Sequence, residues 1–241
     1  MDKFNVIKIS SVDSTNQHVL SLRSDRVFKE GLAFIAKYQH KGRGQRGNLW
    51  ESERGKNLLV SLLIEPNVLL SDQFIISKIA CLSVIDCLLS LGVEAKIKWP
   101  NDILIQKKKI AGILVDNVVS KGMITHSVIG IGINVNQFFF DDYSPNATSL
   151  KLELDKFFDL EEIQNLLLQS IQRRVISFRL GEDLDVDYLD LLYQKDKVAL
   201  FQAKSERFYG IIRGVNERGG VMIEIEDNIR NFDLKEIRML F

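Results

Sequence analysis

Residues 110–135 read IAGILVDNVVSKGMITHSVIGIGINV, and this stretch carries the clearest strand patterns of the chain. Two largely apolar runs, Ile110–Val119 and Ile124–Val135, lie on either side of the turn signal Lys121-Gly122. Runs rich in β-branched residues and joined by a short glycine-containing link predict two strands paired as a hairpin. The fold is therefore expected to be organised around a sheet.

Strand and helix patterns surround this hairpin on both sides. The expected strands are Phe4–Ile9, Gly31–Gln39, Asn57–Glu65, Ala95–Lys98 and Ile103–Gln106, and the expected helices are 13–24, Ser71–Leu91, Leu160–Phe178 and Asp185–Tyr193. Residues 57–65 are almost all apolar, which predicts a strand buried on both faces. Together these elements predict an α+β fold in which helices pack on one face of a mixed sheet.

The helix predicted over Ser71–Leu91 is long and reads as amphipathic. Its expected core face carries Ile75, Ile79, Leu82, Ile85 and Leu89. Gly92 follows directly and is the expected C-terminal cap.

After Lys195 the sequence pattern changes from long helices and strands to short strands. Short strand patterns follow one another at Val198–Lys204, Phe208–Val215, Val221–Ile225, Ile229–Phe232 and Glu236–Phe241. Strands this short and close predict a small SH3-like β-barrel. We therefore expect a catalytic domain over residues 1–195 and a barrel domain over 196–241.

Composition excludes several classes of protein. Lys and Arg number 32, as do Asp and Glu, so the chain lacks the basic surface that a general nucleic-acid coating protein needs. No signal peptide is visible at the N-terminus. Residues 122–140 contain no Asp, Glu, Lys or Arg, but their glycines, asparagines and strand-like pattern favour a buried strand over a membrane span.

The two cysteines, Cys81 and Cys87, fall in one predicted helix. They lie roughly 9 Å apart along its axis, beyond the reach of a disulfide. They are expected to be buried thiols in a reducing cytoplasm, and neither they nor the three histidines predict a metal cluster.

The run Gly42-Arg43-Gly44-Gln45-Arg46-Gly47-Asn48-Leu49-Trp50 is the strongest chemical signal. Glycines make such a loop adaptable, and two guanidinium groups suit phosphate or carboxylate. A loop that orders around an anion is one interpretation, and a solvated surface loop is the alternative.

Three further segments bear on this choice. Asp13-Ser14-Thr15-Asn16 offers hydroxyls that serve either as helix caps or as ligand contacts. Lys98-Trp99-Pro100-Asn101-Asp102 is either an ordinary turn or a nucleotide contact. Gly112, together with Gly130 and Gly132, interrupts two strands, and close approach of a ligand is one reason for glycine there. The glycine spacing is not a dinucleotide fingerprint.

Five blocks in this order resemble the biotin protein ligases (biotin–acetyl-CoA-carboxylase ligases). They are Ser-Thr-Asn at 14–16, Gln39 with the Gly42–Trp50 loop, Lys-Trp-Pro-Asn-Asp at 98–102, Lys-Ile-Ala-Gly-Ile-Leu-Val at 109–115 and Gly-Ile-Gly-Ile-Asn at 130–134. The segment 145–150 also looks like the family's adenine-proximal segment. With the predicted barrel, the resemblance covers essentially the whole chain.

The resemblance implies a two-step reaction that uses ATP, biotin and Mg²⁺. Biotin's carboxylate attacks the α-phosphorus of ATP and gives biotinyl-5′-AMP, and a lysine of a biotin carboxyl carrier domain then takes the biotinyl group. Fixed cations suit such a reaction, because it brings a carboxylate to a polyanion.

The resemblance also implies a role for each matched residue. The implied catalytic residues are Lys109 and Arg43. The implied biotin-binding residues are Ser14, Thr15, Asn16, Gln39, Gly42, Arg43, Gly44, Gln45, Lys109, Gly112 and Gly130. The implied ATP- and adenylate-binding residues are Arg43, Arg46, Trp50, Asn101, Asp102, Lys109, Asn134 and Thr148, with Asp102 as the candidate Mg²⁺ ligand.

Two positions depart from the family pattern. Gln45 and Asn48 stand where many members carry arginine, so retention of the adenylate is expected to rely on Arg43, Arg46 and Lys109. The chain begins at its first predicted strand, so we expect the monofunctional type, with no operator DNA binding.

Other expectations concern partners and alternatives. We expect a cytoplasmic enzyme with no membrane association, and we leave open a homodimer formed through edge strands. A lipoate or octanoate ligase of the same superfamily is the alternative activity, although the chain lacks three consecutive glycines. A vitamin-binding adaptor and an RNA-binding module are the non-enzymatic alternatives, and the zero net charge opposes the second.

Overall fold

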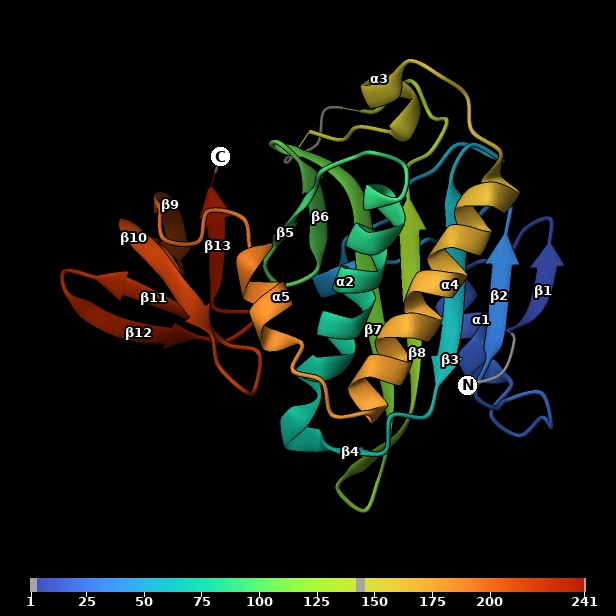
Figure 1. Ribbon diagram of the computed structural model, residues 1–241, viewed down its shortest axis with the longest axis horizontal. Helices are drawn as coiled ribbons and strands as arrows, with labels where there is room; N and C mark the ends of the chain where they lie inside the picture. The colour runs from blue at the N-terminus through green and yellow to red at the C-terminus, as the bar shows by residue number, and fades with distance from the viewer. Residues whose placement is uncertain (1–3, 142–145, 241) are drawn as a thin grey trace.

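A computed structural model describes residues 4–141 and 146–240 of the chain (Figure 1). A mixed eight-stranded sheet runs through the larger part, with the strand order β1-β2-β3-β8-β7-β6-β5 and β4 paired to β8. Its strands are β1 Asn5–Ile9, β2 Leu32–Ala36, β3 Leu58–Ile64, β4 Val68–Leu69, β5 Lys96–Lys98, β6 Asp102–Ile105, β7 Lys108–Ser120 and β8 Met123–Ile133. The β1–β2 pair is parallel and the other pairs are antiparallel. The predicted hairpin of β7 and β8 is thus confirmed, with Gly112 directly opposite Gly132.

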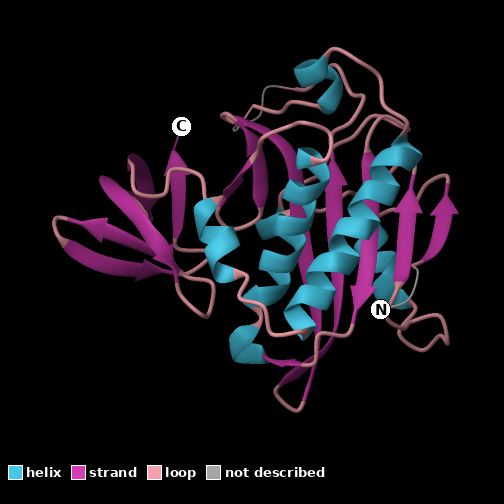
Figure 2. Cartoon of the chain, in the orientation of Figure 1, coloured by secondary structure: helices cyan, strands magenta, loops and turns pink. Residues whose placement is uncertain are grey.

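Two long helices, α2 Phe74–Leu89 and α4 Leu160–Arg179, lie side by side on one face of this sheet (Figures 1 and 2). This agrees with the predicted arrangement. Every residue of β3 is buried, as its apolar run predicted. The main core lies between the sheet and these helices, and the short helices α3 Leu150–Leu154 and α5 Asp185–Asp190 flank it.

The short helix α1, Thr15–Ser21, packs on the opposite face. Its Val19 joins Leu32, Phe34, Leu63 and Val128 in a second, smaller apolar cluster. Neighbouring residues of a strand point to opposite faces, so β2 and β3 supply both clusters. The β2–β3–β8 part of the sheet is therefore covered on both sides. The first turn of α1 lies against interior positions of β3, β7 and β8, where Asn16 contacts Ser61, Leu114 and Gly130.

The predicted amphipathic character of α2 was wrong. Leu89, assigned to the core face, is 60% exposed, whereas Lys78 and Ser83 are buried. The helix is enclosed by the sheet, α4 and α5, and Lys78 forms an ion pair with Asp185 at the start of α5. A helix covered on several sides shows no single apolar stripe.

Arg174 of α4 holds the helical layer together. Its guanidinium donates to both carboxylate oxygens of Asp86 on α2, at 2.8 and 2.9 Å, and to Asp187 of α5 at 2.5 Å. These hydrogen bonds raise the pKa of Arg174 above its usual range. One side chain thereby joins three helices.

The C-terminal part is a five-stranded antiparallel sheet in the order β12-β11-β10-β9-β13. Its strands are β9 Val198–Ala203, β10 Glu206–Val215, β11 Val221–Ile225, β12 Asn228–Phe232 and β13 Ile237–Leu240. The strands were predicted correctly, but the closed barrel was not. Among the described residues β12 and β13 are the two edges and do not pair, so the sheet stays open.

Both cysteines are buried and unpaired, as predicted. Burial raises the pKa of each thiol, and nearby Asp86 adds to this at Cys87, whose pKa rises to about 12. None of the helices in residues 4–141 and 146–240 has the length and hydrophobicity of a membrane span.

Candidate active site

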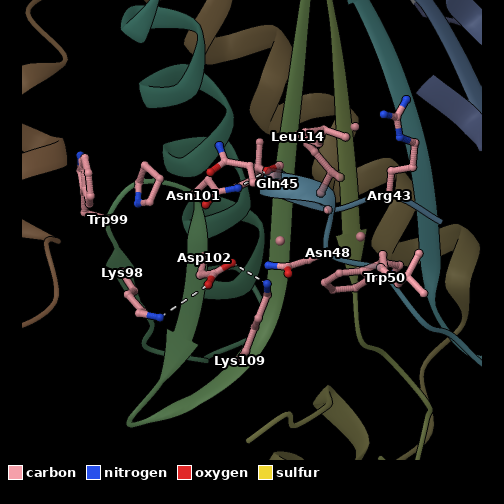
Figure 3. Close-up of a pocket in the computed structure, with 18 of the residues that line it drawn as sticks. Arg43, Gln45, Asn48, Trp50, Lys98, Trp99, Asn101, Asp102, Lys109 and Leu114 are labelled. Carbon is pink, nitrogen blue, oxygen red and sulfur yellow. Dashed lines mark hydrogen bonds and ion pairs between the residues drawn. The ribbon is translucent and has the colours of Figure 1, made fainter. Parts of the chain in front are cut away.

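One pocket of about 210 Å³ gathers the predicted segments above the middle of the sheet (Figure 3). Thirteen of the seventeen predicted site residues line it: Ser14, Thr15, Asn16, Gln39, Arg43, Gly44, Gln45, Trp50, Asn101, Asp102, Lys109, Gly112 and Gly130. The other four are Gly42, Arg46, Asn134 and Thr148. Segments that are far apart in the sequence therefore meet at one place.

Thr15 and Gln39 form the polar end of the pocket. The Gln39 side-chain oxygen accepts from the Thr15 backbone N–H at 2.8 Å and from its hydroxyl at 3.0 Å. Ser14 occupies the N-cap position of α1, but its side chain makes no capping hydrogen bond. Gln39 thus satisfies one of the helix's first N–H groups, and the Ser14 hydroxyl is not used as the cap that the sequence alone allowed.

Asn16 lies deeper, and its hydrogen bonds go to the protein. Its amide nitrogen donates to the Leu114 carbonyl at 3.2 Å and to Asp116 at 2.8 Å, and its oxygen accepts from Ser61 at 2.5 Å. A Cβ added to Gly130 would collide with this amide. Close approach therefore does explain the glycine, but the approaching group is Asn16.

The Gly42–Trp50 loop forms a small closed hairpin. Trp50 N–H donates to the Gly42 carbonyl at 3.0 Å, and Gly44 N–H donates to the Asn48 carbonyl at 2.7 Å. Gly42 is buried in this hairpin, where an added Cβ would overlap the Trp50 carbonyl. The hairpin fixes where the Trp50 ring projects.

The indole of Trp50 packs over Gly112 and Gly132. A Cβ on Gly112 would lie 2.9 Å from the ring, and one on Gly132 would overlap it. The paired glycines therefore admit an aromatic ring against the sheet. The slot predicted for a ligand is here lined by Trp50, which closes one side of the pocket.

Arg43 and Lys109 do not point toward each other (Figure 3). The Arg43 guanidinium extends away from Lys109, although both residues line the same pocket. The backbone of Arg46 lies in the turn Gln45–Gly47, and its side chain lies outside what the structure describes.

Asp102 is paired with two lysines. Lys109 Nζ lies 2.5 Å from one carboxylate oxygen and Lys98 Nζ lies 3.9 Å from the other (Figure 3). Lys109 Nζ is also 5.5 Å from the centre of the Trp50 ring. The neighbouring Asn101 is buried, and its amide donates to the Ile113 carbonyl at 2.5 Å, which ties this turn to β7.

Asn134 and Thr148 support Lys109 from behind. Thr148 N–H donates to the Lys109 carbonyl at 2.9 Å, and the Asn134 amide donates to the Thr148 carbonyl at 2.9 Å. Both side chains are buried. In this structure, they therefore fix the backbone of Lys109 and lie outside the pocket lining.

Further lining residues were not assigned roles from sequence. Lys98, Trp99, Asn48 and Leu114 line the pocket, and the C-terminal sheet adds Phe201, Ile212, Val221, Ile237, Arg238 and Met239. Lys98 and Trp99 belong to a segment that the sequence had singled out. The C-terminal residues carry no local motif, so only the tertiary fold brings them here.

The charge of the pocket suits anions. Arg43, Lys98, Lys109 and Arg238 line it, and Asp102 is the acidic residue among the described lining. Among the described residues, no group of three or more His, Cys, Asp or Glu side chains is arranged to hold a metal ion. Mg²⁺ commonly binds through one carboxylate and substrate phosphates, so Asp102 fits a metal that arrives with a nucleotide.

Fold and site together define a protein with a pocket rich in cationic side chains over a mixed sheet. Residues 9–134 match the model of the biotin/lipoate A/B protein ligase family. This match spans more than half of the chain, and the chain therefore belongs to that family.

Curated relatives carry ligase names. The chain is 36% identical to the bifunctional ligase/repressor BirA of Salmonella typhimurium, over 95% of this chain and 72% of the relative. It is 28% identical to the biotin–[acetyl-CoA-carboxylase] ligase of Mycobacterium tuberculosis, over 90% of this chain and 82% of that protein. It covers 66% of the bifunctional ligase/repressor BirA of Bacillus spizizenii, at 28% identity and over 87% of this chain.

Solved structures give the same picture. The biotin protein ligase from Aquifex aeolicus, in complex with biotin and ATP, superposes with a TM-score of 0.80. The two chains are 27% identical, and the match covers 98% of each. The larger sheet and the C-terminal sheet are therefore both part of the shared architecture.

Proposed function

We propose that this protein is an ATP-dependent biotin protein ligase. It joins biotin and ATP into biotinyl-5′-AMP and then transfers biotin to a lysine of a biotin carboxyl carrier domain. The observation that carries the proposal is the single pocket in which five separate segments place hydroxyls, an amide and cations together. The relatives named as biotin ligases, and the Aquifex structure with biotin and ATP, support it over the lipoate alternative.

The first step needs charge neutralisation. An oxygen of the biotin carboxylate attacks the α-phosphorus, the bond to the bridging oxygen breaks, and pyrophosphate leaves. Lys109 would lie between the carboxylate and the α-phosphate, and Arg43 would turn into the pocket from its hairpin. Fixed positive charges at the developing charge lower the barrier most where water is excluded.

The polar end of the pocket would hold the biotin ring. Ser14 and Thr15 carry hydroxyls, and the Gln39 amide nitrogen faces the loop near Gly42. These groups match the donors and acceptors of a ureido ring. Asn16 would act through the wall it forms with Ser61 and Asp116, and the backbones of Gly42, Gly44, Gly112 and Gly130 would give the ring room.

The part of the pocket around Asp102 and Lys109 would hold the nucleotide. Asn101, Asp102, Trp50 and Lys109 would contact it, with Arg46 from the loop and with Asn134 and Thr148 keeping Lys109 in place. Mg²⁺ bound to the phosphates would find a ligand in Asp102 once Lys109 turns to the substrate. The metal would supply further charge neutralisation at the phosphates.

The second step needs no side-chain nucleophile from this chain. The amine of the carrier lysine attacks the acyl carbon of the mixed anhydride, an amide forms, and AMP leaves. The adenylate hydrolyses readily, so the Gly42–Trp50 hairpin would shield it from water until the carrier arrives. Because the reaction consumes ATP, we place it in the cytoplasm, and we propose no operator DNA as a partner.

The proposal is tested by incubating the protein with biotin, α-labelled ATP and a purified biotin carboxyl carrier domain. We expect labelled biotinyl-AMP without the carrier, and biotinylated carrier with it. Replacing biotin by lipoate or octanoate should give no adenylate. Adenylation of lipoate but not biotin would overturn the assignment in favour of the alternative activity.

Lys109→Ala separates a ligase from a binding protein. We expect adenylate formation to fall at least about 100-fold, as for loss of a charge-stabilising group, while biotin binding measured by calorimetry is largely kept. Lys121→Ala, in the exposed turn between β7 and β8, is the matched control and should behave as wild type. If binding and turnover fell together in Lys109→Ala, the adaptor alternative would gain support.

A further inference from the structure

The turn between β5 and β6 is connected to the C-terminal sheet through Trp99. The indole Nε1–H of Trp99 donates to the carbonyl of Gly219 at 2.9 Å. In Figure 3 the Trp99 ring stands at the end of the pocket opposite Trp50, beside the turn that carries Asn101 and Asp102. The hydrogen bond spans 120 residues of sequence and joins the two sheets at the pocket.

The Gly219 carbonyl is held firmly. The backbone N–H groups of Arg218 and Gly220 both donate to the Asn216 side-chain oxygen, at 3.0 and 2.9 Å. Gly219 has a φ of +90°, and an added Cβ there would overlap the ring of Phe74 on α2. The β10–β11 turn therefore packs tightly against Phe74 of α2, and this packing fixes the position of the Gly219 carbonyl.

The other side of the β5–β6 turn is also supported. The hydroxyl of the fully buried Tyr188 donates to the Pro100 carbonyl at 3.4 Å, and the Tyr188 ring meets Phe74 edge to face at 5.6 Å. The thiol of Cys81 lies 3.9 Å from the same carbonyl. The Trp99-Pro100 segment is thus held by contacts with α2, with α5 and with the turn between β10 and β11.

This turn leads directly into the charged end of the pocket. Asn101 is tied to β7, and Asp102 sets the position of Lys109 through an ion pair of 2.5 Å. We propose that Trp99 is a positioning residue: its bond to Gly219 lets the C-terminal sheet set the placement of Asp102 and Lys109. The inference rests on the proposed adenylation, and it assigns the C-terminal sheet a role in the first step of the reaction.

Trp99→Phe tests the bond, because it keeps an aromatic ring and removes the donor. Loss of one hydrogen bond predicts a rise of about five-fold in KM for ATP, measured by pyrophosphate release. KM for biotin should change less than about two-fold, because the Thr15–Gln39 hydrogen bonds at the proposed ring site involve no residue of the 99–102 turn. Tyr209→Phe, which removes an exposed hydroxyl from β10, is the control and should match wild type.

Gly219→Ala provides an independent variant that displaces the acceptor. It should raise KM for ATP in the same selective way. In the double variant Trp99→Phe/Gly219→Ala the two effects should not add, since both remove one interaction.

Additive effects, an equal rise in both KM values, or unchanged KM for ATP would overturn the proposal. Failure of Trp99→Phe to fold, seen by circular dichroism, would also overturn it by making Trp99 a structural residue. A wild-type protein that forms no biotinyl-AMP would instead refute the proposed function itself.

Discussion

At Gly132, a missing side chain makes room for a ring. The Trp50 indole occupies the space where a Cβ would project, so any larger residue pushes the loop hairpin away from the sheet. Gly132 thus allows β8 to pack directly against the Gly42–Trp50 loop. From the sequence alone, we attributed this space to a ligand.

Gly132→Ala should therefore destabilise the protein. Overpacking of this kind costs about 2 kcal/mol, which corresponds to a fall in Tm of roughly 5 °C for a chain of this size. Differential scanning calorimetry measures the shift. Gly214→Ala is the matched control, because its Cβ would meet no heavy atom closer than 3.9 Å. Equal stability of the two variants would show that the Trp50 ring does not rest on Gly132.

Gln45 tests the departure from the family pattern. It lines the pocket without charge, so Gln45→Arg adds a charge-assisted contact to the adenylate phosphate and should slow its release about five-fold. Gln45→Glu, with the opposite charge, should speed release. The rate of loss of labelled biotinyl-AMP from the enzyme reports both, and identical rates for all three proteins would contradict the expectation.

Among the secondary-structure elements, α2 shows how burial raises the pKa of side chains that ionise to an anion. Cys81 and Cys87 have raised pKa values, and burial also raises the pKa of Tyr188 beside the same helix. A group whose folded pKa lies above its unfolded value stabilises the fold fully below the unfolded pKa, and this stabilisation is lost as the pH rises.

The free energy of unfolding should therefore decrease above about pH 9. Each buried thiol contributes a slope of up to about 1.4 kcal/mol per pH unit between its unfolded and folded pKa values. Urea denaturation at pH 8, 9 and 10 measures it, and Cys87→Ala should flatten the curve. A curve that is level over this range would argue against buried thiols in α2.

Arg174 joins α2, α4 and α5, so its replacement should be costly. Arg174→Lys keeps one charge but loses the two-pronged contact with Asp86, and we expect a loss of about 1–2 kcal/mol. Arg173→Lys, one residue earlier and exposed, should cost little. Equal urea midpoints for the two variants would contradict the role of Arg174.

A structural feature could be predicted from the sequence when the residues that determine it are close together in the chain. The apolar run of β3 and the Lys121-Gly122 turn carry their own signals, so their strands were predicted correctly. Leu89 was misplaced because the surroundings of α2 are set by helices far along the chain. The prediction of a closed barrel was wrong for the same reason, because closure requires hydrogen bonding between β12 and β13, which no local pattern specifies. Trp99 was recognised within a motif, but nothing local in the sequence indicates that Gly219, 120 residues away, is its partner.

At the scale of the whole molecule, the two sheets share one core. Phe201, Ile212 and Ile237 of the C-terminal sheet belong to the same buried cluster as the residues between the large sheet and α2. The apolar interior is therefore continuous across the division that we predicted at residue 195.

A single unfolding transition should follow from this continuity. Calorimetry should show one endotherm whose calorimetric and van't Hoff enthalpies agree, as for one cooperative unit. Two separate endotherms would mean that the C-terminal sheet unfolds independently of the larger part.

The ion pair between Lys109 and Asp102 bears on what the pocket admits. A lysine that already has a counter-ion gains little from exchanging it for another simple carboxylate, because attraction and desolvation nearly cancel. Under the proposed function, a phosphate and a carboxylate that arrive together would carry more negative charge and would displace Asp102 from Lys109. A small organic acid alone would then compete poorly for this lysine.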